Sequence, residues 1–205
     1  QVNAQLSKSA FRTPHELDGN VISLTGRDAA DDVVTRVFAR KTYRNFRTRV
    51  DGEQIARAIR TTQGALASGP SPKTLSKALI GEILRWFGPF FSDERLLPKY
   101  AYASPGALNA SQVFVEANGV EGLWPGLYYF HPADHTLTLV SLGTQAEEGI
   151  RLHVYGKRSR IQEVYSTNVD EVLHLEAGHM LGLLEEVATE NGLFPTIAPP
   201  PHAGP

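Results

Sequence analysis

A lysine and a tyrosine stand side by side at Lys99 and Tyr100, directly after Pro98. A neighbouring ammonium group favours the phenolate, so it lowers the pKa of a tyrosine from about 10 toward that of a usable general base. A proline biases the residue before it toward extended backbone, which favours an irregular segment here. The pair is a candidate for proton transfer, and two ordinary surface residues are the alternative interpretation.

A segment of small and hydrogen-bonding residues follows and includes Ser104, Gly106 and Asn109. Because glycine has no Cβ, the backbone can approach a planar ligand closely there. We predict that this segment is a ligand-binding loop. Its position just after Lys99 and Tyr100 would bring the ligand and the base together.

A basic stretch lies earlier in the chain. From Arg36 to Arg49 there are six basic residues and no acidic one, and Arg40, Lys41, Thr42 and Arg44 form its centre. Arginine presents a planar fork that binds phosphate at two points, and threonine adds a neutral donor. A phosphate-bearing ligand is one interpretation, and a solvated basic face is another. A nucleic-acid surface is disfavoured because few aromatic side chains are interleaved.

The last third of the chain contains two histidines and two glycines with informative spacing. His174 and His179 are five apart, whereas the helical metalloprotease motif places its histidines four apart, so we predict no metal site. Gly178 and Gly182 are four apart and would leave one helix face without side chains. Such a face admits a flat ligand or a second helix, and simple packing is the alternative.

Composition narrows the possible functions further. The chain has 205 residues, 41% hydrophobic residues and no cysteine, so it fits one globular domain without disulfides or thiolate metal sites. The net charge of −2 argues against a dedicated nucleic-acid binder. No apolar run reaches the ~18 residues of a membrane span, and no secretory leader is visible. We expect a cytoplasmic protein whose redox chemistry, if any, uses a borrowed cofactor.

The sequence predicts helices in the first part of the chain, then a small sheet, and then one long helix. Helices are predicted from Asp28, from Asp51 with a capping box, and from Ser71 with Pro72 at the first turn to Phe87. Alternating residues predict strands over 112–117, 126–130, 136–140 and 150–155, with the middle two forming a hairpin. The long helix runs over 169–191, between Asn168 and Gly192.

This order predicts an α+β fold. Residues 1–27 are interpreted as an N-terminal arm or edge, 28–194 as the domain and 195–205 as a proline-rich tail. The wide apolar face of the long helix suggests that this helix is central.

Four segments together resemble the nitroreductase superfamily of flavin mononucleotide (FMN) enzymes. Within it, they are most similar to SagB-type dehydrogenases and to the oxidase domains of nonribosomal peptide synthetases. Residues 97–108 are similar to the family's Leu-Pro-Lys-Tyr-x-Tyr-Pro-Ser-Ala-Gly-Gly/Ala-Leu motif. Residues 40–46, 120–132 and 175–180 resemble its arginine-rich, valine–glutamate–glycine–leucine and central-helix signatures.

The resemblance implies a small, mostly antiparallel sheet flanked by helices, a long central helix, and an intertwined homodimer with FMN at the interface. It also implies oxidation of a thiazoline or oxazoline, tethered to a carrier protein, to the thiazole or oxazole, with molecular oxygen as electron acceptor. Lys99 and Tyr100 would be the catalytic pair. The implied FMN contacts are Arg40, Lys41, Thr42, Arg44, Ser104, Gly106 and Asn109.

Two other functions stay open. A synthetase-bound domain of the same fold can oxidise a different precursor, such as a glutamine-derived precursor of a blue pigment. The family's Pro-Ile-Gly turn over the flavin is matched only approximately by residues 195–198, which favours a flavin-free docking domain as the second alternative.

Overall fold

The computed structural model describes residues 19–28, 31–39, 74–91, 98–144 and 147–197. Its centre is a five-stranded sheet in which every neighbouring pair of named strands is antiparallel. The strands lie in the order β1-β4-β3-β2-β5. Their bounds are Val21–Ser23 for β1, Ser111–Asn118 for β2, Gly126–His131 for β3, Thr136–Leu142 for β4 and Gly149–Gly156 for β5.

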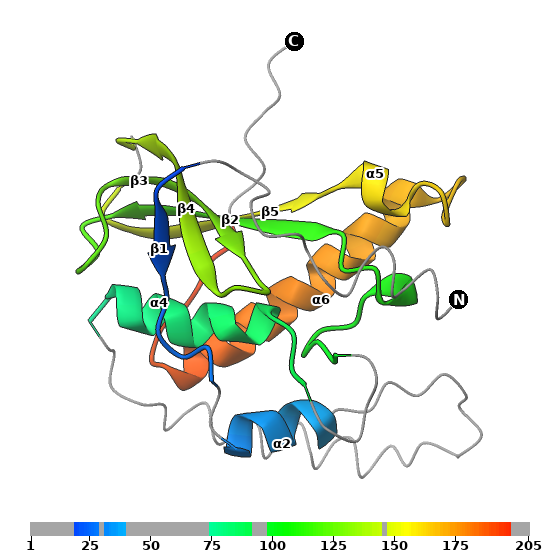
Figure 1. The fold of residues 1–205 in the computed structure, drawn as a ribbon, viewed down its shortest axis with the longest axis horizontal. Coiled ribbons are helices and arrows are strands. Elements are labelled where there is room, and N and C mark those ends of the chain that lie inside the picture. Colours follow the sequence, from blue (N-terminus) through cyan, green and yellow to red (C-terminus); the bar gives the residue numbers. More distant parts are fainter. Residues whose placement is uncertain (1–18, 29–30, 40–73, 92–97, 145–146, 198–205) are drawn as a thin grey trace.

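Helices cover one face of this sheet. Figure 1 shows α4 and α6 beneath the strands, with α2 beyond them. The bounds are Asp31–Ala39 for α2, Lys77–Leu84 for α4, Arg158–Ile161 for α5 and Val169–Glu190 for α6, with 3-10 turns η1 at Arg85–Phe87 and η2 at Pro105–Ala107. The predicted α+β class, with a small antiparallel sheet, flanking helices and one long helix, is confirmed.

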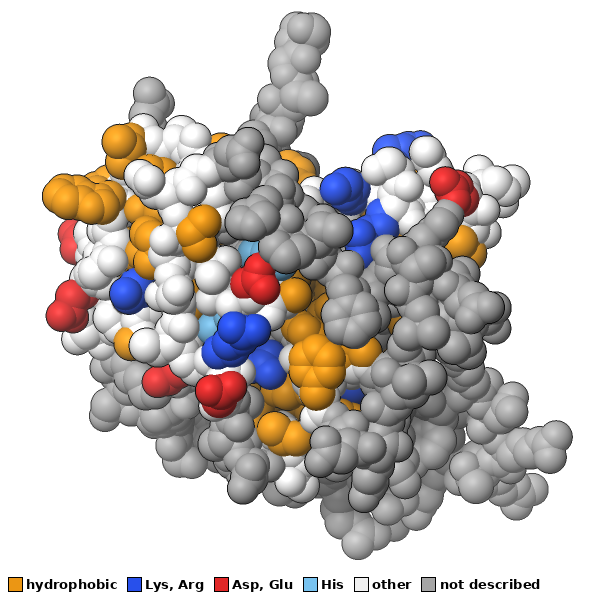
Figure 2. Space-filling model, viewed as in Figure 1, with side chains coloured by type: hydrophobic (Ala, Val, Ile, Leu, Met, Phe, Trp, Pro, Cys, Tyr) orange, Lys and Arg blue, Asp and Glu red, His pale blue; other side chains and the backbone are white. Residues whose placement is uncertain are grey.

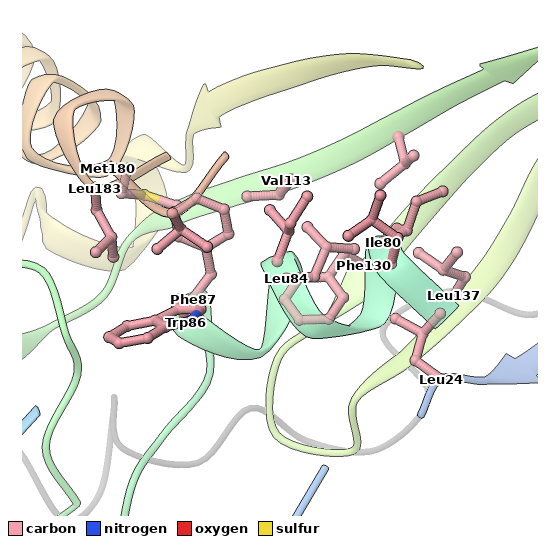
Figure 3. Packing of buried hydrophobic residues seen from close by; sticks show 14 of the residues in the cluster. Leu24, Ile80, Leu84, Trp86, Phe87, Val113, Phe130, Leu137, Met180 and Leu183 are labelled. Carbon is pink, nitrogen blue, oxygen red and sulfur yellow. The ribbon is translucent and has the colours of Figure 1, made fainter. Parts of the chain in front are cut away.

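The inner face of the sheet and the helices share one hydrophobic core. Along β2 every second residue is buried, so Val113 and Val115 point inward as their alternation predicts. Figure 3 shows Leu84 of α4, Phe130 of β3 and Met180 of α6 in one buried cluster. Each fully buried side chain of this kind contributes roughly 1.5–3 kcal/mol to folding.

The start of α4 corrects one prediction. Leu75 precedes the helix, and the cap is Ser76, whose hydroxyl accepts from the Leu79 amide at 3.2 Å. Helix α4 therefore begins later than predicted and ends at Leu84, from which the η1 turn continues to the predicted end at Phe87. The predicted cap at Ser71 lies outside the described residues. Gly81 is required within α4, because a Cβ there would lie 2.4 Å from the Thr25 carbonyl oxygen.

The long helix begins and ends as predicted, but its buried stripe differs. Asn168 is the N-cap residue, and Gly192 follows the helix with a φ of 75°. The inward face carries Val172, Leu173, Glu176, Met180, Leu183 and Val187. Leu175 is 61% exposed, although its apolar side chain belongs to the wide apolar face that the sequence predicts for this helix. One face of α6 is thus open in this chain.

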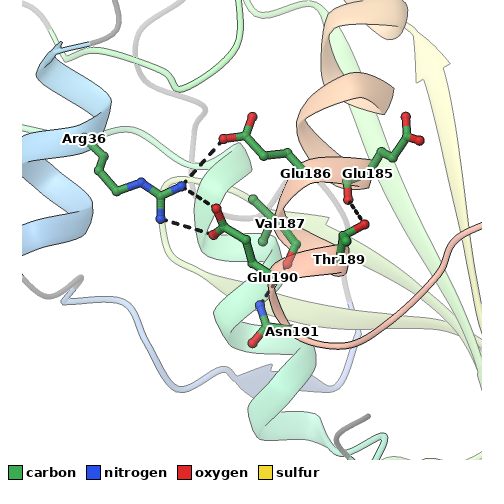
Figure 4. A network of polar contacts seen from close by, with 7 residues as sticks. All are labelled: Arg36, Glu185, Glu186, Val187, Thr189, Glu190 and Asn191. Carbon is green, nitrogen blue, oxygen red and sulfur yellow. Dashed lines mark hydrogen bonds and ion pairs between the residues drawn. The ribbon is translucent and has the colours of Figure 1, made fainter. Parts of the chain in front are cut away.

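An ion-pair cluster joins α2 to the end of α6. Arg36 binds both carboxylate oxygens of Glu190, at 2.7 and 3.1 Å, and lies 3.6 Å from Glu186 (Figure 4). Its guanidinium also lies 5.0 Å from the centre of the Trp86 ring. The first arginine of the basic stretch therefore has a structural role.

The outer face of the sheet carries no described helix. Exposed apolar side chains at one end of the strands include Trp124, Val140 and Leu142, and Figure 2 shows hydrophobic side chains over the β3 and β4 region. Within the described part of the chain, no helix is both long and apolar enough to cross a membrane. The helix predicted from Asp51 lies outside the described residues.

Candidate functional site

Lys99 forms an isolated antiparallel β-bridge with Phe90, which follows the η1 turn in the sequence. Its amide and carbonyl exchange two hydrogen bonds of 2.8 Å with Phe90. The half-buried Lys99 ammonium donates to the Phe38 carbonyl at 3.3 Å. Carbonyls at a helix C-terminus carry partial negative charge, so this contact suits a lysine at the end of α2. Phe38 stands two residues before Arg40 in the sequence.

Tyr100 is half-buried, and its ring packs edge-on against Tyr102 at 5.6 Å between centres. Burial lowers the pKa of Arg85, and the positive charge of Arg27 lowers it further. Asp28 and Tyr100 both raise the pKa of Arg85 and so partly offset this shift. Tyr100 therefore lies near enough to Arg85 to interact with its charge.

Arg85 itself is held firmly at the end of α4. Its guanidinium donates to the Pro89 carbonyl at 3.0 Å and lies 4.1 Å from the centre of the Phe90 ring. Sequence reasoning missed this residue, because nothing in the spacing between positions 85 and 100 relates them.

The predicted ligand loop is a tight turn with an unusual backbone. Gly106, Ala107 and Asn109 have positive φ angles of 62°, 55° and 48°. Residues other than glycine rarely adopt a positive φ angle. For such residues this backbone strain costs roughly 1–3 kcal/mol each, and it persists only where the surrounding structure holds it. This concentration of strain supports a functional role for the loop.

A buried carboxylate binds both ends of this turn. Glu176 of α6 is 2% exposed, and its Oε2 accepts the Ser104 hydroxyl at 2.5 Å. Its Oε1 accepts the Ser111 amide at 2.6 Å, while the Ser104 oxygen accepts the Asn109 amide at 2.8 Å. The Ser104 proton is thus directed at Glu176, so a ligand can use this hydroxyl only as an acceptor.

The two other predicted loop residues differ in how they face solvent. Asn109 is 4% exposed and donates from its side chain to the Ala107 carbonyl at 3.1 Å, so it shapes the turn from within. Gly106 is half-buried beside Tyr165, and a Cβ there would lie 3.2 Å from the Tyr165 hydroxyl oxygen. Of the two, Gly106 is the better placed for backbone contact with a ligand.

The loop lies against an open stretch of α6. The His179 ring nitrogen Nδ1 is 3.1 Å from the Ala103 carbonyl oxygen. Gly178 and Gly182 are exposed, and a Cβ added to either would meet no atom within 4 Å. Gly178 and Gly182 therefore leave open space along α6, on a face that differs in direction from Glu176 by about 200° or more. Among the described residues, no group of three or more metal-ligating side chains occurs.

The structure brings Ser104, Gly106 and Asn109 together with α6, and it fixes Lys99 and Tyr100 between α2 and the core. The proposed phosphate contacts Arg40, Lys41, Thr42 and Arg44 lie outside the described residues.

No protein-family model matches the chain. The chain is similar to indigoidine synthase of Streptomyces lavendulae, with 43% identity over 199 residues, and to that of Dickeya dadantii strain 3937, with 39% identity over 199 residues. Both alignments cover 94% of this chain but only 15% and 13% of the respective relatives.

Two crystal structures are also similar to this fold. A candidate nitroreductase from Ralstonia eutropha JMP134 aligns with a TM-score of 0.49 and 17% identity, covering 90% of this chain and 80% of that one. A candidate nitroreductase from Anabaena variabilis aligns with a TM-score of 0.45 and 18% identity, covering 60% and 29% of the two chains.

Proposed function

We propose that this chain is an FMN-dependent oxidase domain of nitroreductase-like fold. In our proposal it dehydrogenates a glutamine-derived precursor, bound to a carrier protein of a peptide synthetase, during synthesis of an indigoidine-type pigment. The observation that carries the proposal is the 43% identity to part of an indigoidine synthase, which extends over 94% of this chain. The motif resemblance over residues 97–108 supports the same assignment.

The residues of the described half of the site fit an FMN ring. The turn around Gly106 offers backbone at close range to a planar group. Arg40, Lys41, Thr42 and Arg44 would hold the phosphate and ribityl chain through charge-assisted hydrogen bonds. Ser104 would accept a hydrogen bond from the ring, and Asn109 would act by shaping the turn.

Dehydrogenation removes a proton and a hydride from neighbouring substrate atoms. FMN, when bound, supplies the capacity to accept the hydride. Tyr100 would take the proton at its phenolate oxygen, and the positive charges of Lys99 and Arg85 would stabilise that phenolate. The Lys99 contact with Phe38 holds the ammonium in place against α2.

The assembly is part of the proposal. The open face of α6, with the exposed Leu175 beside Gly178 and Gly182, would pack against a second copy of the chain. A homodimer would cover this apolar surface and place the site at the interface between the two copies. Molecular oxygen would accept the electrons at the end of the cycle.

Azoline oxidation is the second candidate, and the Lys99–Tyr100 pair favours it because both residues match the pair of the azoline-oxidising relatives. One experiment distinguishes the two candidate substrates. FMN-loaded protein is mixed without oxygen either with a carrier-bound glutamine-derived precursor or with a model thiazoline, and loss of flavin absorbance is followed. Fast reduction by the first supports the pigment assignment, and fast reduction by the second alone would overturn it. Protein that retains no FMN would support the flavin-free docking domain.

A further inference from the structure

Glu176 is the one carboxylate on the inward face of α6. It is 2% exposed and lies between Val172 and Met180, one turn away on either side. A buried carboxylate is costly unless hydrogen bonds replace the lost water. Among the described residues, Glu176 forms no ion pair, and its two oxygens are satisfied by the Ser104 hydroxyl and the Ser111 amide.

These two donors bracket the strained turn. Ser104 precedes the turn and Ser111 begins β2, so one carboxylate fixes both ends of the segment to a 22-residue helix. The contact of 2.5 Å with the Ser104 hydroxyl has the length typical of charge-assisted O–H···O bonds. The Ser104 oxygen then binds the Asn109 amide, which carries the constraint into the turn.

We infer that Glu176 is a positioning residue that presets the Ser104–Ser111 segment for the flavin ring. The inference deepens the proposed function and rests on it. Glu176 does not touch the ring itself, but acts through the Ser104 hydroxyl and the Ser111 amide. Without the carboxylate, the positive φ angles at Ala107 and Asn109 have less to hold them, and the turn relaxes before FMN arrives.

The test compares Glu176→Ala, Glu176→Gln and Ser104→Ala with Glu185→Gln, an exposed glutamate of the same helix, as control. The FMN dissociation constant is measured by flavin fluorescence. Amide hydrogen exchange at Asn109 and Ser111 is measured in the FMN-free protein. Glu176→Ala should weaken FMN binding about tenfold or more and speed exchange at both amides by a similar factor, as expected for a lost charge-assisted bond.

Glutamine can accept the Ser111 amide and donate to the Ser104 oxygen, so Glu176→Gln should recover part of both effects. Ser104→Ala should weaken FMN binding as Glu176→Ala does, and the double variant should add little, because the two residues act as one unit. If Glu176 served general stability alone, its substitution would lower the melting temperature, but the effects of the Glu176 and Ser104 substitutions on FMN affinity would not be coupled.

Wild-type FMN affinity and wild-type exchange in Glu176→Gln and Ser104→Ala would overturn the inference. These two variants decide the matter if Glu176→Ala fails to fold. If the wild-type chain binds no FMN, the proposed function fails instead. Even in that case, hydrogen exchange decides the role of Glu176: unchanged exchange at the Asn109 and Ser111 amides in the Glu176 variants would show that Glu176 does not hold the turn.

Discussion

Two regions of this protein pack against the same helix, α6, and they are held by different forces. The inner sheet face meets α6 through apolar side chains such as Val113 and Met180, and many contacts share the stabilisation. The Ser104–Ser111 turn meets α6 through two short hydrogen bonds to one carboxylate. Core packing tolerates small changes, whereas a few directional bonds fix a geometry and fail together. The core therefore provides stability, and the turn would provide the proposed site.

The largest effect is expected at Tyr100, in the site region. Tyr100→Phe should keep the fold and bind FMN, but lose about 10²–10⁴ in the rate of substrate oxidation, because it removes the proposed general base. Single-turnover loss of flavin absorbance measures this rate. Tyr155→Phe, on the outer sheet face, is the control and should react at the wild-type rate. A wild-type rate in Tyr100→Phe would place the base elsewhere.

The core should respond in the opposite way. Leu84 is 0% exposed, so Leu84→Ala should cost about 2–5 kcal/mol of unfolding free energy through lost burial and a cavity. The folded fraction should still bind FMN with near wild-type affinity. Urea denaturation with Leu142→Ala as the exposed control tests this. A large loss of FMN affinity at unchanged stability would show that core and site are not separable.

Much of the core region could be predicted from sequence because its signals are local. The alternation of Val113 and Val115 predicts β2, and Asn168 and Gly192 mark the ends of α6. The three-residue β1 and the four-residue α5 are too short for a periodic signal. The sequence predicts too early a start for α4 because Ser71 with Pro72 matches a helix-start signal more strongly than Ser76 does.

The site was less predictable because its residues meet only in three dimensions. Ser104, Gly106 and Asn109 follow from local composition, but nothing local joins Arg85 to Tyr100. Glu176 was missed although a signal exists, since it occupies a buried helical position four residues from Val172 and four from Met180. A single glutamate among the apolar positions of a buried helix face predicts that its carboxylate has a buried hydrogen-bond partner.

A smaller effect concerns acid sensitivity of the core region. Burial lowers the pKa of His135 below its ordinary value; the Thr25 carbonyl opposes this shift, and Arg85 adds to it. The unfolded chain binds the proton more readily, so stability should fall as pH drops below about 6.5, the ordinary histidine pKa. His135→Gln should flatten this dependence between pH 7 and 5, measured by denaturation at each pH. His174→Gln, an exposed substitution, should leave it unchanged, and an equal flattening there would reject the assignment.

The smallest effect is expected at the α2–α6 ion pairs. Arg36 and Glu190 have side chains that are 41% and 46% exposed, so solvent screens their attraction. Arg36→Ala should cost about 1 kcal/mol or less, including the loss of its contact with Trp86. High salt should reduce the difference between the variant and wild type. A cost above about 3 kcal/mol would mean that docking of α2 depends on this cluster far more than exposed pairs allow.

In the proposed function, this chain binds FMN and oxidises a synthetase-bound precursor. The most direct measurement is the visible spectrum of the purified chain, reconstituted with FMN and mixed without oxygen with the carrier-bound glutamine-derived precursor. We expect flavin absorbance that survives gel filtration, disappears as the precursor is added, and returns when oxygen is admitted. A colourless protein after reconstitution, or flavin absorbance that the precursor leaves unchanged, would contradict the proposed function.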